Sequence, residues 1–210
     1  MENVKRPSTK VKTPSPILMG EGWRSRGEGM RVLLIALCGI VPMMAACSKD
    51  VRVSTPTLHV VSGAINDGGV VPTAYTCDGH NYSPPIKWSS PPRLTASFAV
   101  MCDDPDAPSG DFTHWIVYNI PPEMRRLPEQ VPSTTTLSSG AHQGQNDFER
   151  IGYNGPCPPQ GPAHHYHFHV YALDRRLTLA DNAGRSDFDA AIKGHIFAQG
   201  ELVATYARAE

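Results

Sequence analysis

Three short stretches of the chain carry residue types that could do chemistry. In the first, DDPDAPSGDFTHW (residues 103–115), Asp104 and Asp106 end one apolar run and His114 opens the next. Residues two apart in an extended chain project to the same side, so a turn here would bring both carboxylates and the imidazole to one end of a sheet. A carboxylate beside an imidazole favours the charged ring and fixes its orientation. Taken alone, the aspartates could equally form turns and His114 could be a core histidine. The prolines stiffen this loop, and Pro108 is a candidate for a cis peptide bond.

The second stretch, GYNGPCPPQGPAHHY (residues 152–166), is a Gly/Pro-rich loop. Glycines let the backbone approach a ligand closely, and exposed backbone N–H groups in such a loop can form an anion-binding nest. The loop ends on His164 and Tyr166, which would share one face of the following strand. The alternative is an inert connection.

The third stretch is the histidine run itself. Alternation along a strand divides it between two faces, with His164, Tyr166 and Phe168 on one and His165, His167 and His169 on the other. A His-x-His pair such as His165 and His167, with one carboxylate, would resemble a zinc site. Strand-borne histidines are more often packed or solvent-exposed, so the sequence assigns no metal site and no cofactor.

The elements that must position these residues are mainly strands. The chain of 210 residues contains 20 Pro, 18 Gly and 40% hydrophobic residues, which is typical of a loop-rich β protein with a core. Short apolar runs separated by turn clusters indicate one β-sandwich or barrel-like domain. Strands are expected over residues 58–65, 86–88, 96–104, 112–120, 165–173 and 201–207.

One helix is expected near RSDFDAAIKGHI (residues 185–196). Ser186 is the expected N-cap, and Asp187 and Asp189 would lie in the first turn. Phe188, Ala191 and Ile192 would share the buried face.

The N-terminal part has the layout of an export signal. Met30 and Arg31 precede an apolar run, Val32 to Ala46, that ends in small residues before Cys47. At about 15 residues this run is shorter than the roughly 20 needed to span a bilayer. Met-Ala-Ala-Cys resembles a bacterial lipobox, with Met44 where Leu is usual, so Cys47 is the expected lipidation site. An uncleaved membrane anchor and a non-lipidated secretory signal are the alternatives.

This layout divides the chain into four parts. Residues 1–29 would be disordered or precede the true start, residues 30–46 a lipoprotein-type signal, residues 47–56 a tether, and residues 57–208 the folded domain. The expected location is the bacterial cell envelope, lipid-anchored on the periplasmic side of the outer membrane, with a soluble periplasmic protein as the alternative. Residues 47–210 hold twelve Lys/Arg and seventeen Asp/Glu, hence a net charge of −5. This charge points to no nucleic-acid partner and argues against direct attraction to anionic lipid surfaces.

Export would leave three cysteines in an oxidising compartment. Cys77 and Cys157 both lie in Gly/Pro-rich loops, which makes them the favoured disulfide pair, whereas Cys102 lies in an apolar strand and is expected to be a buried thiol. Two free cysteines at positions 77 and 157 are the alternative.

At these motifs the chain resembles the phosphatidylethanolamine-binding protein family, in particular its bacterial Raf-kinase-inhibitor-like branch. The matching stretches are YTCDGHNYSPPIKW, DDPDAPSGDFTHWIVYNIPP, GYNGPCPPQGPAHHYHFHVYALD and AQGELVATYAR. They run in the family's order, and the resemblance extends over nearly all of residues 55–208. The resemblance implies a mainly β fold, a β-sandwich of a larger and a smaller sheet with a few short helices. It also implies a small pocket that binds anions such as a phospholipid headgroup. Carried over residue by residue, that pocket comprises Asp104, Asp106, His114, Gly155, Pro156, His164 and Tyr166. His165 stands where the family usually has Arg.

The resemblance favours a non-enzymatic, envelope-anchored binding protein for a small anion or phospho-headgroup. Its docking partner would be an unidentified protein, since relatives inhibit kinases or proteases. The alternative is a hydrolase that uses the pocket Asp, His and Tyr residues on a phospho-compound or ester. The sequence contains no G-x-S-x-G, H-E-x-x-H, P-loop or C-x-x-C motif to support that alternative.

Overall fold

The computed structural model describes residues 55–208. The predicted signal segment, the lipidation of Cys47 and most of the tether fall on residues 1–54, which lie outside the described residues, and they stay predictions. No helix in residues 55–208 combines the length and the apolar character that crossing a membrane requires.

The larger sheet has five antiparallel strands in the order β6-β4-β3-β7-β8. These strands are β3 (Ser97–Asp104), β4 (Phe112–Ile120), β6 (His142–Gln143), β7 (His164–Leu173) and β8 (Ile196–Tyr206). Strand β3 lies at the centre, and every one of its residues is buried. Its apolar side chains divide by alternation between two core clusters, Phe98 and Val100 in one and Ala99 and Met101 in the other.

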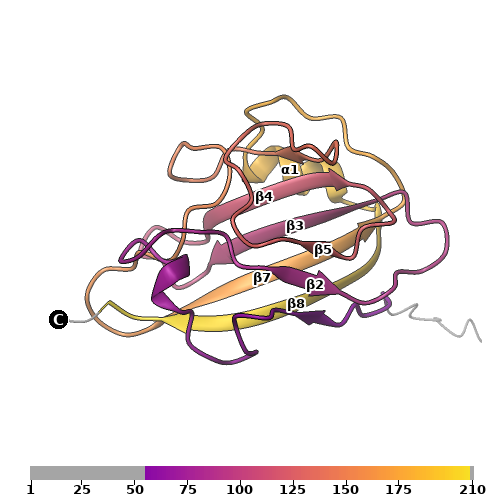
Figure 1. Ribbon diagram of the computed structural model, residues 1–210. Coiled ribbons are helices and arrows are strands. Elements are labelled where there is room, and N and C mark those ends of the chain that lie inside the picture. The colour runs from indigo at the N-terminus through magenta and orange to yellow at the C-terminus, as the bar shows by residue number, and fades with distance from the viewer. Residues whose placement is uncertain (1–54, 209–210) are drawn as a thin grey trace, which may run out of the picture. The chain divides into compact units, whose positions relative to one another are not determined.

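The smaller sheet is antiparallel in the order β1-β2-β5, and Figure 1 shows it in front of the larger one. Its strands are β1 (Val60–Val61), β2 (Ile86–Trp88) and β5 (Arg126–Leu127), and a short 3-10 helix, η1 (Thr73–Tyr75), lies between β1 and β2 in the chain. Ile86 and Trp88 join Phe168 and Val170 of β7 in the first core cluster. The two sheets therefore pack face to face, as the β-sandwich prediction requires.

The opposite face of the larger sheet is covered by α1 (Arg185–Ile192). Phe188 and Ile192 pack on it with Met101 and Tyr118, so the predicted buried face of the helix is confirmed. The predicted N-cap is wrong: Gly184 occupies that position without a side-chain cap, and Ser186 is already inside the first turn. A glycine is tolerated there because Ncap residues adopt extended, non-helical backbone angles.

The predicted strands agree with the structure for β2, β3, β4 and β7 and differ from it for β1 and β8. β2 and β4 have the predicted bounds, and β3 and β7 differ by one residue at one end. β8 begins at Ile196, five residues earlier than expected, whereas β1 keeps only two of the eight residues predicted to be a strand. Among the described residues no peptide bond is cis, so the suggestion of a cis bond at Pro108 is also wrong.

Candidate functional site

The first part of the site is the hairpin that joins β3 to β4. Asp104 is the last residue of β3 and pairs with Phe112, the first residue of β4. The register shifts between the pairs Cys102–Trp115 and Asp103–Thr113, so His114 is an extra residue on β4. Such a bulge re-aims a side chain out of the regular alternation. His114 is 2% exposed, and it lines a cavity together with Asp104.

Asp104 is tied to the first residue of β7. The Nδ1 atom of His164 lies 2.8 Å from Oδ2 of Asp104, and the backbone N–H of Asp106 donates to Oδ1 at 2.9 Å. Both carboxylate oxygens of this buried residue are therefore compensated. Because Nδ1 of His164 faces the carboxylate, the Nε2 atom is the nitrogen left for a ligand.

His114 is held in a mainly aromatic environment. Its Nδ1 atom lies 2.6 Å from the backbone oxygen of Asn154, which assigns the proton to Nδ1 because a carbonyl can only accept. The rings of Phe112, Phe148 and Tyr166 meet the imidazole edge-on, with centroids 5.3–5.4 Å away. Burial lowers the pKa of His114 below its ordinary value, against the opposing effects of the Asn154 carbonyl and Asp104. The ring is thus neutral at pH 7, and Nε2 carries a lone pair.

Tyr166 lies behind His114 rather than at the cavity surface. Its side chain is fully buried on β7, and it is absent from the cavity lining. Burial and the negative charge of Asp104 raise the pKa of the phenol, so it stays protonated. Its hydroxyl has no hydrogen-bond partner among the described residues. In this structure Tyr166 packs against His114, and its role as a direct ligand stays a prediction.

Asp106 and His165 form the exposed rim of the site. Asp106 accepts from the backbone N–H of His165 at 2.8 Å and lies 2.7 Å from its Nδ1 atom. These hydrogen bonds lower the pKa of the Asp106 carboxyl. Since both side chains are about half exposed, the pair is screened by water and fixes the rim more than it stabilises the fold.

The Gly/Pro loop is fastened to the loop that follows η1. A disulfide joins Cys77 and Cys157, with the Cα atoms 5.4 Å apart, which is the pairing that the sequence favours, and Cys102 is a buried free thiol. The N–H of Gly155 donates to Oδ1 of Asn81 at 2.7 Å, and the carbonyl of Pro156 accepts from the N–H of Cys77.

The role expected for Gly155 and Pro156 needs correction. Neither residue lines the cavity, the N–H of Gly155 is already bonded, and proline has no N–H. A Cβ on Gly155 would overlap the carbonyl oxygen of Tyr75, so this glycine serves close packing between two loops. The neighbouring residues Cys157, Pro158 and Pro159 form the cavity wall instead.

The resulting cavity has a volume of about 170 Å³. Asp104, His114 and His164 are the three predicted residues that line it, and the structure brings them together from three strands. Most of its apolar walls come from residues inside the two motifs, and Phe148, four residues before the Gly/Pro loop, is the wall residue that neither motif contains. The remaining lining residues are Ala107, Pro108, Ser109, Phe112, Phe148, Cys157, Pro158 and Pro159. The lining contains no Lys or Arg, so any anion here depends on imidazoles and neutral donors.

Comparison with known proteins defines the class of protein that this fold and site represent. The family model for phosphatidylethanolamine-binding proteins matches residues 61–207, and the chain belongs to that family. It is 45% identical to a UPF0098 protein of Methanothermobacter thermautotrophicus over 151 residues, which cover 72% of this chain and 99% of the relative. It is 34% identical to the UPF0098 protein YbhB of Escherichia coli, with 71% of this chain and 99% of the relative covered.

Solved structures agree with this membership. A phosphatidylethanolamine-binding protein homologue of Chlamydia trachomatis matches with a TM-score of 0.66 and 35% identity, covering 74% of this chain and 100% of that one. YbcL of Escherichia coli, described as a member of the mammalian family, matches with a TM-score of 0.68 and 34% identity, covering 72% of this chain and 99% of that one. The resemblance inferred from the motifs is confirmed, as is the mainly β fold with two antiparallel sheets.

Proposed function

We propose that this protein is a binding protein whose cavity holds a small oxyanion or a phosphorylated headgroup. The observation that carries the proposal is the convergence of two imidazoles, from β4 and β7, on one cavity of about 170 Å³. Water occupies about 30 Å³ per molecule in the liquid, so this volume suits a group the size of phosphate with a few waters or a short alcohol.

Binding an anion would require a proton at His114. Nδ1–H of this residue is committed to Asn154, so Nε2 must become protonated before it can donate to an oxyanion. The bound negative charge would favour that protonation, and the surrounding aromatic rings and prolines would strengthen the attraction because they exclude water. Binding is therefore coupled to proton uptake.

The carboxylate of Asp104 is compatible with an anionic ligand. Its two oxygens already accept from His164 and from the N–H of Asp106, so little of its charge faces an incoming oxyanion unopposed. An ammonium group on the same ligand, as in ethanolamine phosphate, would gain from the carboxylate.

One observation favours hydrolysis as a second candidate function. The contact of Asp104 with Nδ1 of His164 is the arrangement by which a carboxylate orients a general base. Cys157, the cysteine of the cavity, is in a disulfide, and no hydrogen bond in residues 55–208 joins Ser109 to either imidazole. A hydrolase here would have to activate water, and we favour binding without turnover.

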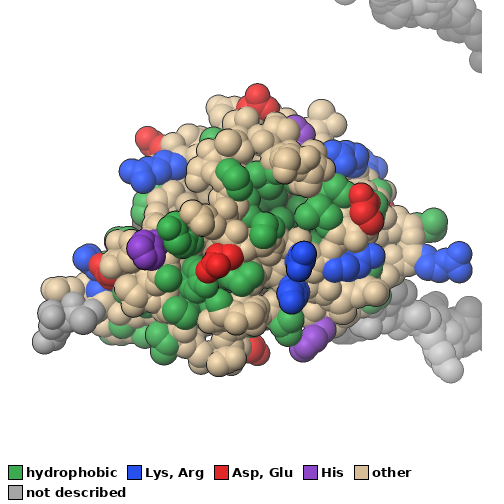
Figure 2. All heavy atoms as spheres, in the orientation of Figure 1, with side chains coloured by type: hydrophobic (Ala, Val, Ile, Leu, Met, Phe, Trp, Pro, Cys, Tyr) green, Lys and Arg blue, Asp and Glu red, His purple; other side chains and the backbone are tan. Residues whose placement is uncertain are grey.

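The proposed cellular setting is the envelope. Residues 30–47 support export and lipid anchoring at Cys47, with a soluble periplasmic protein as the alternative. The exposed pair Asp106 and His165 would give a kinase- or protease-like protein partner a rim to contact. On the face shown in Figure 2, several basic side chains lie near one another towards the right, whereas the acidic side chains are scattered among hydrophobic ones.

Calorimetric titration with inorganic phosphate and with ethanolamine phosphate tests the proposal. We expect one site per chain, an affinity that His164→Ala lowers at least tenfold, and no change in His195→Ala. His195 is a matched control because its Nδ1 lies 3.0 Å from Oδ1 of Asp174 in a similar pair outside the cavity. Absence of binding by the parent protein would refute the pocket. Hydrolysis of p-nitrophenyl phosphate or acetate that disappears in His164→Ala would instead establish the enzyme.

A further inference from the structure

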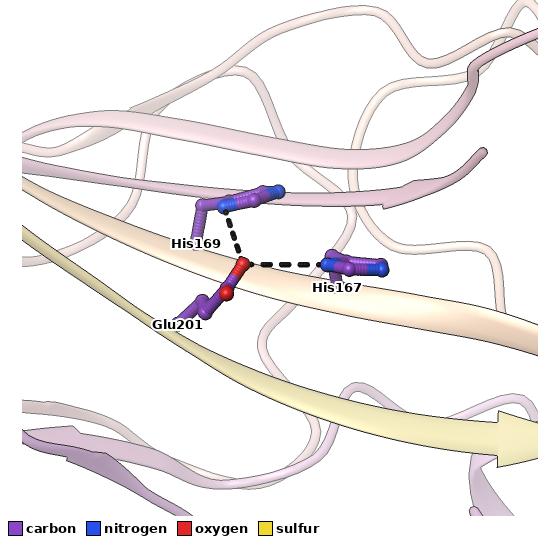
Figure 3. A group of neighbouring side chains, drawn as sticks. All are labelled: His167, His169 and Glu201. Carbon is purple, nitrogen blue, oxygen red and sulfur yellow. Dashed lines mark hydrogen bonds and ion pairs between the residues drawn. The ribbon is translucent and has the colours of Figure 1, made fainter. Parts of the chain in front are cut away.

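A second cluster of chemically active side chains lies on the other face of β7, away from the cavity. His167 and His169 project from β7, and Glu201 projects from β8, where it pairs directly with His169. Figure 3 shows both imidazoles turned toward the Glu201 carboxylate. Oε2 of Glu201 lies 3.3 Å from Nδ1 of His167 and 3.6 Å from Nδ1 of His169. One ligand atom from each residue lies within 4.8 Å of the others.

A hydrogen bond to Asp103 determines which nitrogen of His169 faces the cluster. The Nε2 atom of His169 lies 3.1 Å from Oδ1 of Asp103, a carboxylate that is only 6% exposed and also accepts from Arg185. A carboxylate only accepts, so Nε2 carries the proton, and in the neutral ring Nδ1 is a lone pair. Nδ1, the other ring nitrogen, faces the Glu201 carboxylate at 3.6 Å and is the nitrogen left to ligate an ion.

We propose that His167, His169 and Glu201 bind one zinc-class divalent ion. Two imidazoles and one carboxylate are a common three-residue donor set for zinc. Imidazole nitrogens suit zinc and similar transition metals, whereas magnesium and calcium prefer ligands that are all oxygen. Asp103 would hold His169 in the tautomer and orientation needed for ligation, which is the usual carboxylate–histidine–metal arrangement.

The fourth coordination position would open toward a groove. His169 and Glu201 line a hollow of about 740 Å³ between β8 and the segment around β1. Structural zinc sites are closed by four protein ligands, whereas sites with three keep a position for water or a ligand. The ion would therefore be accessible from this groove, on a different face of β7 from the oxyanion cavity.

The sequence suggested His165 and His167 as a possible zinc pair, and two features of the fold explain why His169 takes the place of His165. His165 has the same alternation as His167, but it is held by Asp106 at the cavity rim. Glu201 is 32 residues from His169 along the chain, and the register of β7 with β8 brings it opposite. The donor set exists only once that register is formed.

Titration of the purified protein with zinc chloride, and with cobalt chloride followed by visible absorption, tests the proposal. We expect one ion per chain and a cobalt spectrum typical of four-coordinate nitrogen and oxygen ligation. Glu201→Gln and His169→Ala should weaken binding at least 100-fold, and Asp103→Asn should weaken it about 10–100-fold, as expected for a group that orients a ligand. His165→Ala is the matched control, from the same strand and face, and should bind as the parent does.

Three results would overturn the site. These are no stoichiometric ion in the parent, loss of binding in His165→Ala or His164→Ala, or unchanged binding in Glu201→Gln. The Glu201 side chain is about half exposed, so its substitution should leave the melting temperature of the metal-free protein unchanged and keep the test valid. Phosphate binding in the cavity is measured separately with the same variants, so failure of one proposal does not imply failure of the other.

Discussion

Gly155 connects the stability of the fold to the shape of the cavity, and Gly155→Ala tests that connection. A methyl group at this position would overlap the carbonyl oxygen of Tyr75 and lie 2.9 Å from both Oδ1 of Asn81 and Cα of Thr76. Two of these three neighbours are backbone atoms, so a change of side-chain rotamer cannot relieve the clash, and the two loops must separate.

The cost of separating the loops can be estimated from its parts. Overpacking of a close contact costs about 1–3 kcal/mol. The hydrogen bonds from Gly155 N to Asn81 Oδ1 (2.7 Å) and from the Tyr153 hydroxyl to Tyr75 O (2.8 Å) meet at this point. Weakening them adds about 1 kcal/mol. A total of about 3 kcal/mol corresponds to a melting temperature lower by about 6–12 °C in a domain of this size.

Thermal unfolding followed by circular dichroism measures this difference, with Gly63→Ala as the matched control. Gly63 is exposed, and a Cβ there would meet nothing within 4 Å. We expect the control to change the melting temperature by less than about 2 °C. Phosphate affinity should fall in Gly155→Ala because the displaced loop carries Cys157 and Pro158 of the cavity wall. Equal melting temperatures for the two variants would refute the packing argument.

Three further predictions concern pH, the disulfide and the N-terminal segment. Burial lowers the pKa of His114, so the unfolded chain takes up a proton near pH 6.5 and the folded chain only at lower pH. The stability contributed by neutral His114 is therefore complete above pH 6.5 and is lost as the pH falls. The urea concentration at the unfolding midpoint should decrease from pH 7.5 to pH 5, and it should decrease less steeply in His114→Asn. A parallel decrease in both proteins would contradict the assignment. The disulfide closes a loop with a sequence separation of 80 residues, for which the chain-entropy model gives about 4.5 kcal/mol. Cys77→Ser/Cys157→Ser should therefore lower the unfolding free energy in urea by about that amount, and a change below about 1 kcal/mol would argue against the model. Cys47→Ser should move the protein from the membrane to the soluble fraction of cells; retention in the membrane would favour an uncleaved anchor.

Alternation predicted a mainly β domain because it is a local property, and the resemblance to the family specified the sandwich. Tyr166 and Phe168 are buried and His165 is exposed, as a period of two requires. The same reasoning failed for β5 and β6, which have two residues each and exist because of pairing with β2 and β4. Alternation also predicted a β1 that is too long, because apolar residues near the edge of a sheet can pack on the core without pairing with the next strand.

The candidate site was predicted in part. Asp104, His114 and His164 line one cavity, because the proline-rich motifs end at the same edge of neighbouring strands. The positions of Gly155 and Tyr166 were not predictable, since they depend on partners distant in sequence, Tyr75 for the glycine and His114 for the tyrosine.

The residue pattern by itself determined where β3, β4 and β7 lie and which histidines of β7 share a face, because both depend on neighbours in the chain. The motifs identified the family. The tertiary structure alone decided the bulge that turns His114 toward the cavity and the register that sets Glu201 opposite His169. Both depend on how separate strands align, and a shift of one residue in either ladder would send these side chains to the other face.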